Sequence, residues 1–249
     1  VLGGLLPPRR GLRAQRVAAG RVGQGQVAQR LRLLATLAPH AFEQLDGQVE
    51  LADLLCELHP WACMEPMPGM VRYARSGGEA MAVAVRIARA HSGRDRVAFC
   101  GYHGWHDWYL AANIGDLSRL DGQLLPGLEP KGVPQVLKNT ALPFHYNDLT
   151  ELEALVRTHP GEIGVIIMEP ARGELPAPGF LEGVRAIATR IGAVLIFDEI
   201  TSGFRMNLGG IHLLLGVEPD IAVFGKALGN GYPIAALIGR RAVMDSAQE

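Results

Sequence analysis

The sequence is poor in cysteine and has no long apolar run. Its 249 residues include three cysteines, Cys56, Cys63 and Cys100, which cannot all pair and show no Cys-x-x-Cys spacing. Such usage is typical of reduced thiols in a cytoplasmic protein, each packed as a small apolar side chain. No stretch of eighteen apolar residues is present, so we expect no membrane partner. The apolar residues 1–6 lack a preceding basic region and make a poor signal peptide.

Three common motifs of nucleotide and acyl chemistry are absent as well. Gly225 and Lys226 are followed by Ala227 and lack the earlier glycine of a Walker loop. No Gly-x-Gly-x-x-Gly follows an expected strand, and no Gly-x-Ser-x-Gly elbow is found. The sequence therefore gives no support for a P-loop, a Rossmann dinucleotide site or a serine hydrolase.

Charge and composition indicate a globular chain without a polyanionic partner. The formal net charge is −1, which favours neither nucleic acid nor an anionic membrane. Hydrophobic residues make up 48% of the chain and charged residues 20%, enough to bury a large core. Residues 1–40 differ, because they are rich in Arg, Gly and Gln and no acidic residue precedes Glu43. We expect an atypical basic segment at 1–40, either a surface helix or poorly ordered, and a large domain at 41–249.

Short apolar strands alternate with helices along that domain. The apolar runs predict strands at 70–74, 97–100, 163–168, 193–197, 221–224 and 234–238. Helical spacing and end signals predict helices at 50–58, 78–91, 149–158 and 180–191. Residues 112–142 contain Gly and Pro throughout and suggest a surface excursion. Strands that are apolar on both faces predict an α/β fold with a mostly parallel sheet and helices on both faces.

Polar residues follow five of these strands, and in such a sheet ligands bind beyond the carboxyl ends of the strands. These residues are Ser76, Gly77, Gly78, Tyr102, His103, Glu169, Asp198 and Lys226. They bring a glycine-rich turn, an aromatic pair, two carboxylates and a lysine toward one edge of the sheet. The sequence therefore predicts a candidate site there.

Each of these groups has a functional and a purely structural interpretation. A glycine-rich turn before a helix offers N–H groups to a phosphate, although many such turns need glycine for geometry alone. A buried Asp198 needs a cationic partner such as a protonated pyridine nitrogen, or it caps a loop or pairs with Arg205. Lys226 has small neighbours that allow close ligand approach and suit a Schiff-base amine, whereas most lone lysines are solvated. Tyr102 and His103 present a ring face to a flat ligand or pack in the core.

A metal site is the weaker interpretation of the aromatic segment. His103, His106 and Asp107 suggest a zinc-dependent hydrolase, but Gly104 and the lack of a distal ligand motif argue against it. We therefore expect no metal.

Four blocks, in unbroken order over about residues 45 to 245, resemble class III pyridoxal-phosphate (PLP) aminotransferases. Within these, they are most similar to the branch that includes glutamate-1-semialdehyde 2,1-aminomutase. The blocks are RYARSGGEAMAVAVRIARAHSGRDRV, GYHGWHDW, IIMEPARGELPAPGFLEGVRAIATRIGAVLIFDEITSGFR and GVEPDIAVFGKALGNGYPIAAL. The resemblance implies fold type I of the PLP enzymes, with pyridoxal 5'-phosphate as cofactor. It also implies a homodimer and PLP-dependent amino-group transfer on a small amino or keto substrate.

The resemblance also implies roles for individual residues. Lys226 would form the Schiff base and carry the proton, and Asp198 would bind the pyridine nitrogen. Ile200 would pack against the ring, and Tyr102 would stack on its other side with His103 nearby. Ser76, Gly77 and Gly78 would bind the phosphate. Glu169 and Glu174 would lie on the substrate side of the pocket.

The sequence departs from the family pattern in three places. Relatives usually carry threonine where Gly78 stands, so one hydroxyl contact to the phosphate is expected to be lost while the backbone contact remains. Residues 1–40 lack the usual Gly-His-x-His-Pro type segment. The sequence stops at Glu249, where relatives continue with a small C-terminal domain, so that domain is expected to be missing. The alternative function is therefore a truncated, inactive remnant that serves as a structural or interaction module.

Overall fold

The computed structural model describes residues 29, 33, 45–63, 70–123 and 126–247. Nearly all of the basic segment 1–40 lies outside these residues, and the predicted boundary at 40/41 stays a prediction. The strands are β1 Met70–Ala74, β2 Arg96–Cys100, β3 Ala141–Pro143, β4 Ile163–Met168, β5 Val194–Asp198, β6 Ile221–Phe224 and β7 Ala235–Gly239. The helices are α2 Leu45–Leu58, α3 Gly77–Ser92, α4 Asp107–Leu110, α5 Leu149–Thr158, α6 Phe180–Ile191, α7 Ile211–Leu215 and α8 Arg241–Met244.

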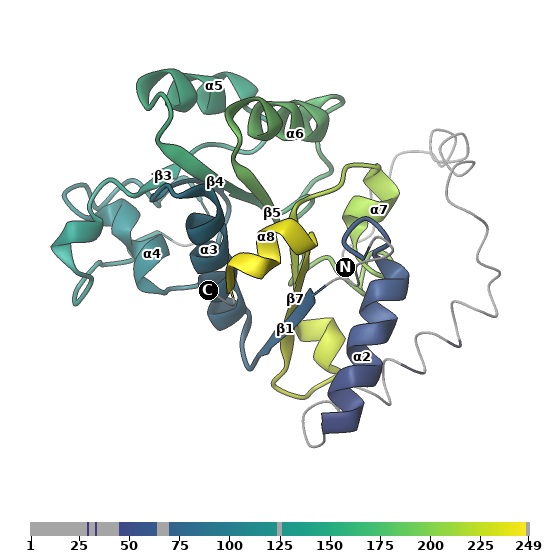
Figure 1. Cartoon of the computed structure of the whole chain (residues 1–249). Helices are drawn as coiled ribbons and strands as arrows, with labels where there is room; N and C mark the ends of the chain where they lie inside the picture. The colour runs from purple at the N-terminus through teal and green to yellow at the C-terminus, as the bar shows by residue number, and fades with distance from the viewer. Residues whose placement is uncertain (1–28, 30–32, 34–44, 64–69, 124–125, 248–249) are drawn as a thin grey trace, which may run out of the picture.

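The seven strands form one mixed, mostly parallel sheet in the order β1-β7-β6-β5-β4-β2-β3 (Figure 1). Strands β3, β2, β4, β5 and β6 run parallel, whereas β7 is antiparallel to both β6 and β1. It follows that β1 runs in the same direction as the parallel strands. The carboxyl ends of β1, β2, β4, β5 and β6 therefore share one edge, as the sequence predicts for a doubly covered α/β sheet.

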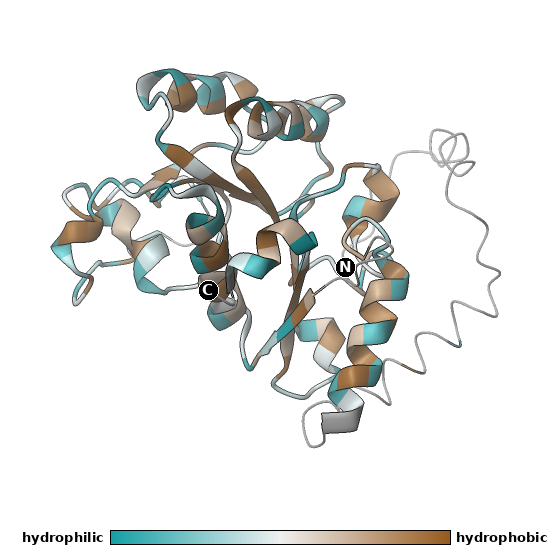
Figure 2. Cartoon of the chain, viewed as in Figure 1, coloured by the Kyte–Doolittle hydropathy of each residue, from teal (hydrophilic) through white to brown (hydrophobic). Residues whose placement is uncertain are grey.

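Alternate residues of each strand face opposite layers of helices. In β4, Val165 and Ile167 join the cluster that contains α3, whereas Ile166 and Met168 join the cluster that contains α5 and α6. A third cluster packs α2 against Phe224 of β6 and its neighbours in β7. Because both faces of a strand are buried, nearly every strand residue is apolar, which explains the continuous apolar runs. Figure 2 shows the central strands mainly in the brown of hydrophobic residues.

Local signals position the helix that points its N-terminus at the shared edge. Ser76 is the N-cap of α3, and its Oγ accepts a hydrogen bond from the backbone N–H of Glu79. The Glu79 side chain accepts in return from the N–H of Arg75, which satisfies a second free donor. Gly93 ends the helix with φ of 65°, a left-handed conformation that glycine adopts without strain. The first turn of α3 is thus fixed directly after β1.

Several details differ from the sequence-based expectations. Helix α2 begins at Leu45 rather than at residue 50, and the short helices α4, α7 and α8 were not predicted. Strands β5 and β7 each begin and end one residue later than predicted. Residues 141–143, at the end of the predicted surface excursion, form the edge strand β3. No helix in the described part of the chain is long and apolar enough to cross a membrane.

Candidate active site

The predicted polar residues do meet at the carboxyl edge of the sheet. Asp198 is the last residue of β5, Glu169 follows β4 directly, and Lys226 lies two residues after β6. Contacts link these strand ends to one another and to the start of α3. A Cβ added to Gly77 would lie 2.7 Å from Ile200 Cδ1, and one added to Gly225 would lie 3.5 Å from Ile200 Cγ2. Ile200 therefore sits between the glycine-rich turn and the segment that carries Lys226.

Asp198 is a buried carboxylate with two partners. Its Oδ2 lies 2.7 Å from Nδ1 of His103, and its Oδ1 accepts a 3.0 Å hydrogen bond from the backbone N–H of Ile200. The other ring nitrogen of His103, Nε2, lies 3.0 Å from the carbonyl oxygen of Cys100. Within the described chain the carboxylate thus pairs with His103 and not with Arg205, and its bond to Ile200 fixes the next turn. This pairing orients Asp198 at the bottom of the site.

Lys226 is an exposed amine on a strained backbone. Its Nζ donates a 2.9 Å hydrogen bond to Oγ1 of Thr201, three residues beyond Asp198. Its φ is 47°, a left-handed conformation that few non-glycine residues adopt. The short 3-10 helix η3, Lys226–Gly229, starts at this point and turns the chain sharply after β6. Strain of this kind collects at functional sites, because the surrounding fold has to hold it in place.

The glycine-rich turn provides an anion-binding position. The first N–H groups of an α-helix have no partners within the helix, and the helix dipole makes this end positive. Ser76 caps the N–H of Glu79, so the N–H groups of Gly77 and Gly78 point outward from the first turn. A Cβ at Gly77 would lie 2.7 Å from Cδ1 of Ile200, so the Ile200 side chain would have to shift to admit one. The turn therefore has a packing role as well as the capacity to bind phosphate.

The aromatic pair after β2 divides between the core and the site. His103 is buried against Asp198, while Tyr102 is half-buried and packs edge-to-face on Tyr109 with ring centroids 5.7 Å apart. Tyr102 thus lies next to His103, and its role as a residue that stacks on the cofactor ring stays a prediction. The metal interpretation gains nothing, because no group of three His, Cys, Asp or Glu side chains in the described ranges is arranged to hold an ion.

A pocket of about 370 Å³ opens beside these residues at the ends of β2 and β4. Both carboxylates that the resemblance assigns to the substrate side, Glu169 and Glu174, line it together with Arg172 and Tyr146. Glu169 pairs with Arg172 at 2.7 Å. Burial, reinforced by the negative charge of Asp198, nevertheless raises the pKa of Glu169 to about 7. The pocket therefore holds one carboxyl group that changes protonation near neutral pH.

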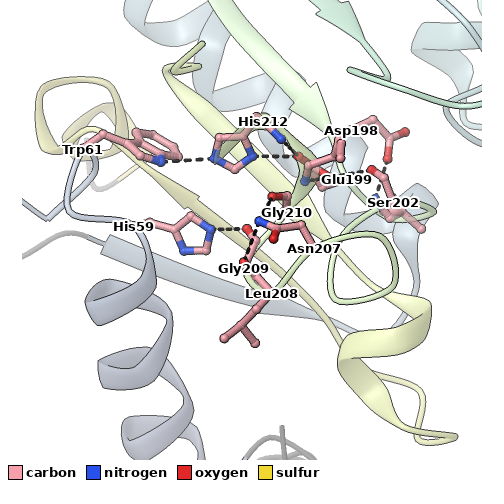
Figure 3. A network of polar contacts seen from close by, with 12 residues as sticks. His59, Trp61, Asp198, Glu199, Ser202, Asn207, Leu208, Gly209, Gly210 and His212 are labelled. Carbon is pink, nitrogen blue, oxygen red and sulfur yellow. Dashed lines mark hydrogen bonds and ion pairs between the residues drawn. The ribbon is translucent and has the colours of Figure 1, made fainter. Parts of the chain in front are cut away.

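Behind Asp198, a network of buried polar side chains holds the following loop. Figure 3 shows His212 between Trp61 and Glu199. Trp61 Nε1 donates to His212 Nε2 at 3.2 Å, so the other nitrogen, Nδ1, carries the proton that His212 donates to Glu199 at 2.7 Å. Glu199 also accepts from Oγ of Ser202 and from the N–H groups of Ile211 and His212. The network ties the end of β5 to the start of α7.

The sequence analysis did not find this network or the partners of the predicted residues. Thr201, the partner of Lys226, lies three residues after Asp198. Arg172, the partner of Glu169, lies three residues after Glu169. This spacing indicates a contact only once the local turn is known. No motif or spacing in the sequence indicates that Glu199 pairs with His212. His103 was placed near the site but without its partner.

Comparisons with known proteins agree with this geometry. The sequence model of the class-III aminotransferase family matches residues 31–249. The chain belongs to this family. A 3-aminobutyryl-CoA aminotransferase of Cloacimonas acidaminovorans is 39% identical over 203 residues, which cover 79% of this chain and 44% of the relative. A glutamate-1-semialdehyde 2,1-aminomutase of Syntrophomonas wolfei is 40% identical over 207 residues, covering 80% and 45%.

The fold matches as well. A solved transaminase with PLP bound superposes with a TM-score of 0.68 and 30% identity, over 87% of this chain and 50% of that one. The chain thus has fold type I of the PLP enzymes, and its family implies pyridoxal phosphate as cofactor. The chain spans less than half the length of the curated relatives it matches. An unrelated metal-dependent hydrolase fold is excluded by the family match.

Proposed function

We propose that this chain carries the cofactor site of a PLP-dependent amino-group transfer enzyme, in which Lys226 binds the cofactor aldehyde as a Schiff base. The observation that supports it most is the position of Lys226. Its amine is exposed on a strained turn, held by Thr201, at the sheet edge where the buried carboxylate of Asp198 also lies. An amine held next to a buried acid is the pair that this cofactor requires.

The side chains at this edge fit the chemical groups of PLP. Asp198 offers a buried carboxylate to the protonated ring nitrogen, and His103 holds that carboxylate in place at 2.7 Å. The N–H groups of Gly77 and Gly78 at the start of α3 offer donors to the phosphate. Ile200 provides an apolar surface for the flat ring, because it lies between Gly77 and Gly225. When bound, the cofactor supplies an electron sink for the substrate carbon that loses a proton.

The protein's own contribution is to move that proton and to orient the substrate. Lys226 Nζ, once free, is the base that removes the proton and later returns it. The pocket lined by Glu169, Arg172 and Glu174 receives the rest of the substrate, a small amino or keto compound. Lys226 lies close enough to Glu169 for its charge to oppose the rise in the pKa of that carboxyl. We propose a homodimer as the assembly, which sedimentation analysis checks.

The test is an absorbance titration of the purified protein with PLP, for the wild type and Lys226→Ala. We expect a Schiff-base band that survives gel filtration in the wild type and is absent from the variant. Asp198→Asn is the second variant, because loss of the carboxylate's charge weakens binding of the protonated ring and shifts the band's titration. A folded wild-type protein without the band contradicts the proposal and leaves the alternative of a structural module without cofactor chemistry.

A further inference from the structure

The amine of Lys226 has a neutral hydrogen-bond partner although a carboxylate is close by. Its Nζ donates to Oγ1 of Thr201 at 2.9 Å. The charge of Lys226 opposes the rise in the pKa of Glu169, which shows that the two groups are near each other. Within the described part of the chain, Glu169 nevertheless pairs with Arg172 at 2.7 Å and not with the lysine. A hydroxyl, and not a carboxylate, therefore holds Lys226.

A hydroxyl and a carboxylate affect a lysine amine differently. An ionised carboxylate only accepts hydrogen bonds, and its charge favours the ammonium form, which has no lone pair to attack an aldehyde. A hydroxyl is both a donor and an acceptor. It accepts a hydrogen bond from the ammonium group and donates one to the lone pair of the neutral amine. A lysine that forms a Schiff base and moves protons passes through both states, and a hydroxyl can bind it in each.

The turn after β5 holds this hydroxyl in place. Oδ1 of Asp198 accepts a 3.0 Å hydrogen bond from the N–H of Ile200. The N–H of Gly203 donates to the carbonyl oxygen of Glu199 at 2.7 Å. Thr201 lies within this turn, and its β-branched side chain has few χ1 rotamers. Because a lysine side chain loses much rotamer entropy when it is held in one place, a rigid partner is needed to fix its amine.

We infer that Thr201 is the positioning residue for Lys226: its hydroxyl holds the amine in both protonation states and keeps it from pairing with the carboxylate of Glu169. This inference deepens the proposed function and rests on it, because it assumes that Lys226 is the amine that binds the cofactor aldehyde. Thr201 acts through Lys226 and has no chemical step of its own.

The first test needs no cofactor. The protein is labelled with a trace of acetic anhydride at a series of pH values around the ordinary pKa of lysine, and the acetylation of each lysine is measured by mass spectrometry. Acetic anhydride reacts with the neutral amine, so the rate at each pH reports the fraction of amine that is uncharged. The other lysines of the chain, Lys131 and Lys138, are internal references in the same digest.

Three variants differ in what they offer to the amine. Thr201→Val offers no hydrogen bond, Thr201→Ser offers the same hydroxyl, and Thr201→Asp offers an acceptor that favours the ammonium form. We expect Val to lower the acetylation rate of Lys226 about two- to tenfold, because the released amine pairs with Glu169, and Ser to stay within about twofold of wild type. Asp should move the rate curve up by about one pH unit or more.

Two further variants separate the contact from a general effect on the fold. Thr158→Val is the matched control, because Thr158 is exposed and its hydroxyl donates to the carbonyl oxygen of Ala154 in α5. The double variant Thr201→Val with Glu169→Gln also removes the carboxylate that competes for the amine. It should therefore return the acetylation curve of Lys226 to the wild-type position.

The second test is the rate of the PLP adduct at Lys226, trapped with borohydride in the same variants. We expect wild type and Ser to be fastest, followed by Val and then Asp. An acetylation rate of Lys226 in Thr201→Val within about twofold of wild type at every pH overturns the role of Thr201. Equal losses in Val and Ser with an unchanged pH dependence also overturn it, since they show a structural role only. Absence of the wild-type PLP adduct overturns the proposed function, while the acetylation curves decide separately whether Thr201 holds Lys226.

Discussion

Glu199 provides the sharpest stability prediction, because its carboxylate accepts four hydrogen bonds in the core. The donors are Oγ of Ser202, the N–H groups of Ile211 and His212, and Nδ1 of His212. Glu199→Ala removes the carboxylate and leaves the three N–H donors buried without partners. Each buried donor left without a partner costs about 1 to 3 kcal/mol, so the loss for three of them is expected to be at least about 3 kcal/mol. Since domains of this size are stable by about 5 to 15 kcal/mol, the loss is a large fraction of the total.

Glu199→Gln gives an intermediate effect for a geometric reason. The amide oxygen of Gln can replace only one of the two carboxylate oxygens and accept the two hydrogen bonds made there. The amide NH₂ takes the place of the other oxygen and cannot accept the hydrogen bonds donated to it. If the oxygen faces His212, the N–H of Ile211 loses its acceptor, whereas the hydroxyl of Ser202 can turn and accept. One unsatisfied buried donor costs about 1 to 3 kcal/mol, so Gln is expected to lie between wild type and Ala.

The assay is urea unfolding followed by far-ultraviolet circular dichroism. Glu218→Ala is the matched control, because it removes an exposed carboxylate that pairs with Arg240 at 2.9 Å. Such a surface pair contributes about 0 to 1 kcal/mol. A loss for Glu199→Ala that stays within about 1 kcal/mol of the control would refute the assignment of Glu199 as the centre of the network. Equal stability of the Gln variant and the wild type would refute the claim that both oxygens of Glu199 accept hydrogen bonds from N–H donors.

Two further predictions concern the same edge of the sheet. The pKa of Glu169 is about 7 in the folded state, whereas its ordinary value is 4.5. Between these two pH values the native state therefore binds more protons than the unfolded state does. Its contribution to stability is therefore present below pH 4.5 and is lost as pH rises through 7, by at most about 3 kcal/mol. Glu169→Gln should gain stability relative to wild type between pH 5 and 8 in urea titrations; no gain contradicts the raised pKa. Gly203→Ala places a Cβ 2.7 Å from the carbonyl oxygen of Glu199 and from Phe224 Cδ1. We expect a loss of about 1 to 3 kcal/mol in the same assay, and an unchanged midpoint would contradict this packing.

Much of the fold follows from the sequence because both faces of the central strands are buried. The runs at 163–168 and 221–224 are continuous apolar segments, and β4 and β6 occupy the same residues. Helices α5 and α6 also begin and end where the sequence predicts, since Asp148 caps the one and Gly192 ends the other. These elements have strong local signals that agree with their tertiary positions.

The elements that were not predicted lack such signals. Strand β3 has three residues, ends in proline and lies at the edge of the sheet, so neither length nor periodicity marks it. The antiparallel placement of β7 between β1 and β6 depends on chain topology rather than on composition.

The site shows the same division between local and long-range information. The positions of Asp198 and Lys226 follow from the strand ends, because a parallel sheet brings these ends together. Their partners do not follow from the sequence. His103 reaches Asp198 across 95 positions, and Trp61 reaches His212 across 151. Gly78 was expected only to lose a contact, whereas the structure shows that its missing side chain makes room for His106.

The claim that Lys226 carries the cofactor is tested most directly by locating the attachment. The protein is incubated with PLP, reduced with borohydride, digested and mapped by mass spectrometry, with Lys138→Ala as a control for nonspecific lysine labelling. We predict that the pyridoxyl-phosphate mass is found on the peptide containing Lys226 at one equivalent per chain, both in the wild type and in the control. A label spread over other lysines, or a folded protein with no label at Lys226, would contradict the account.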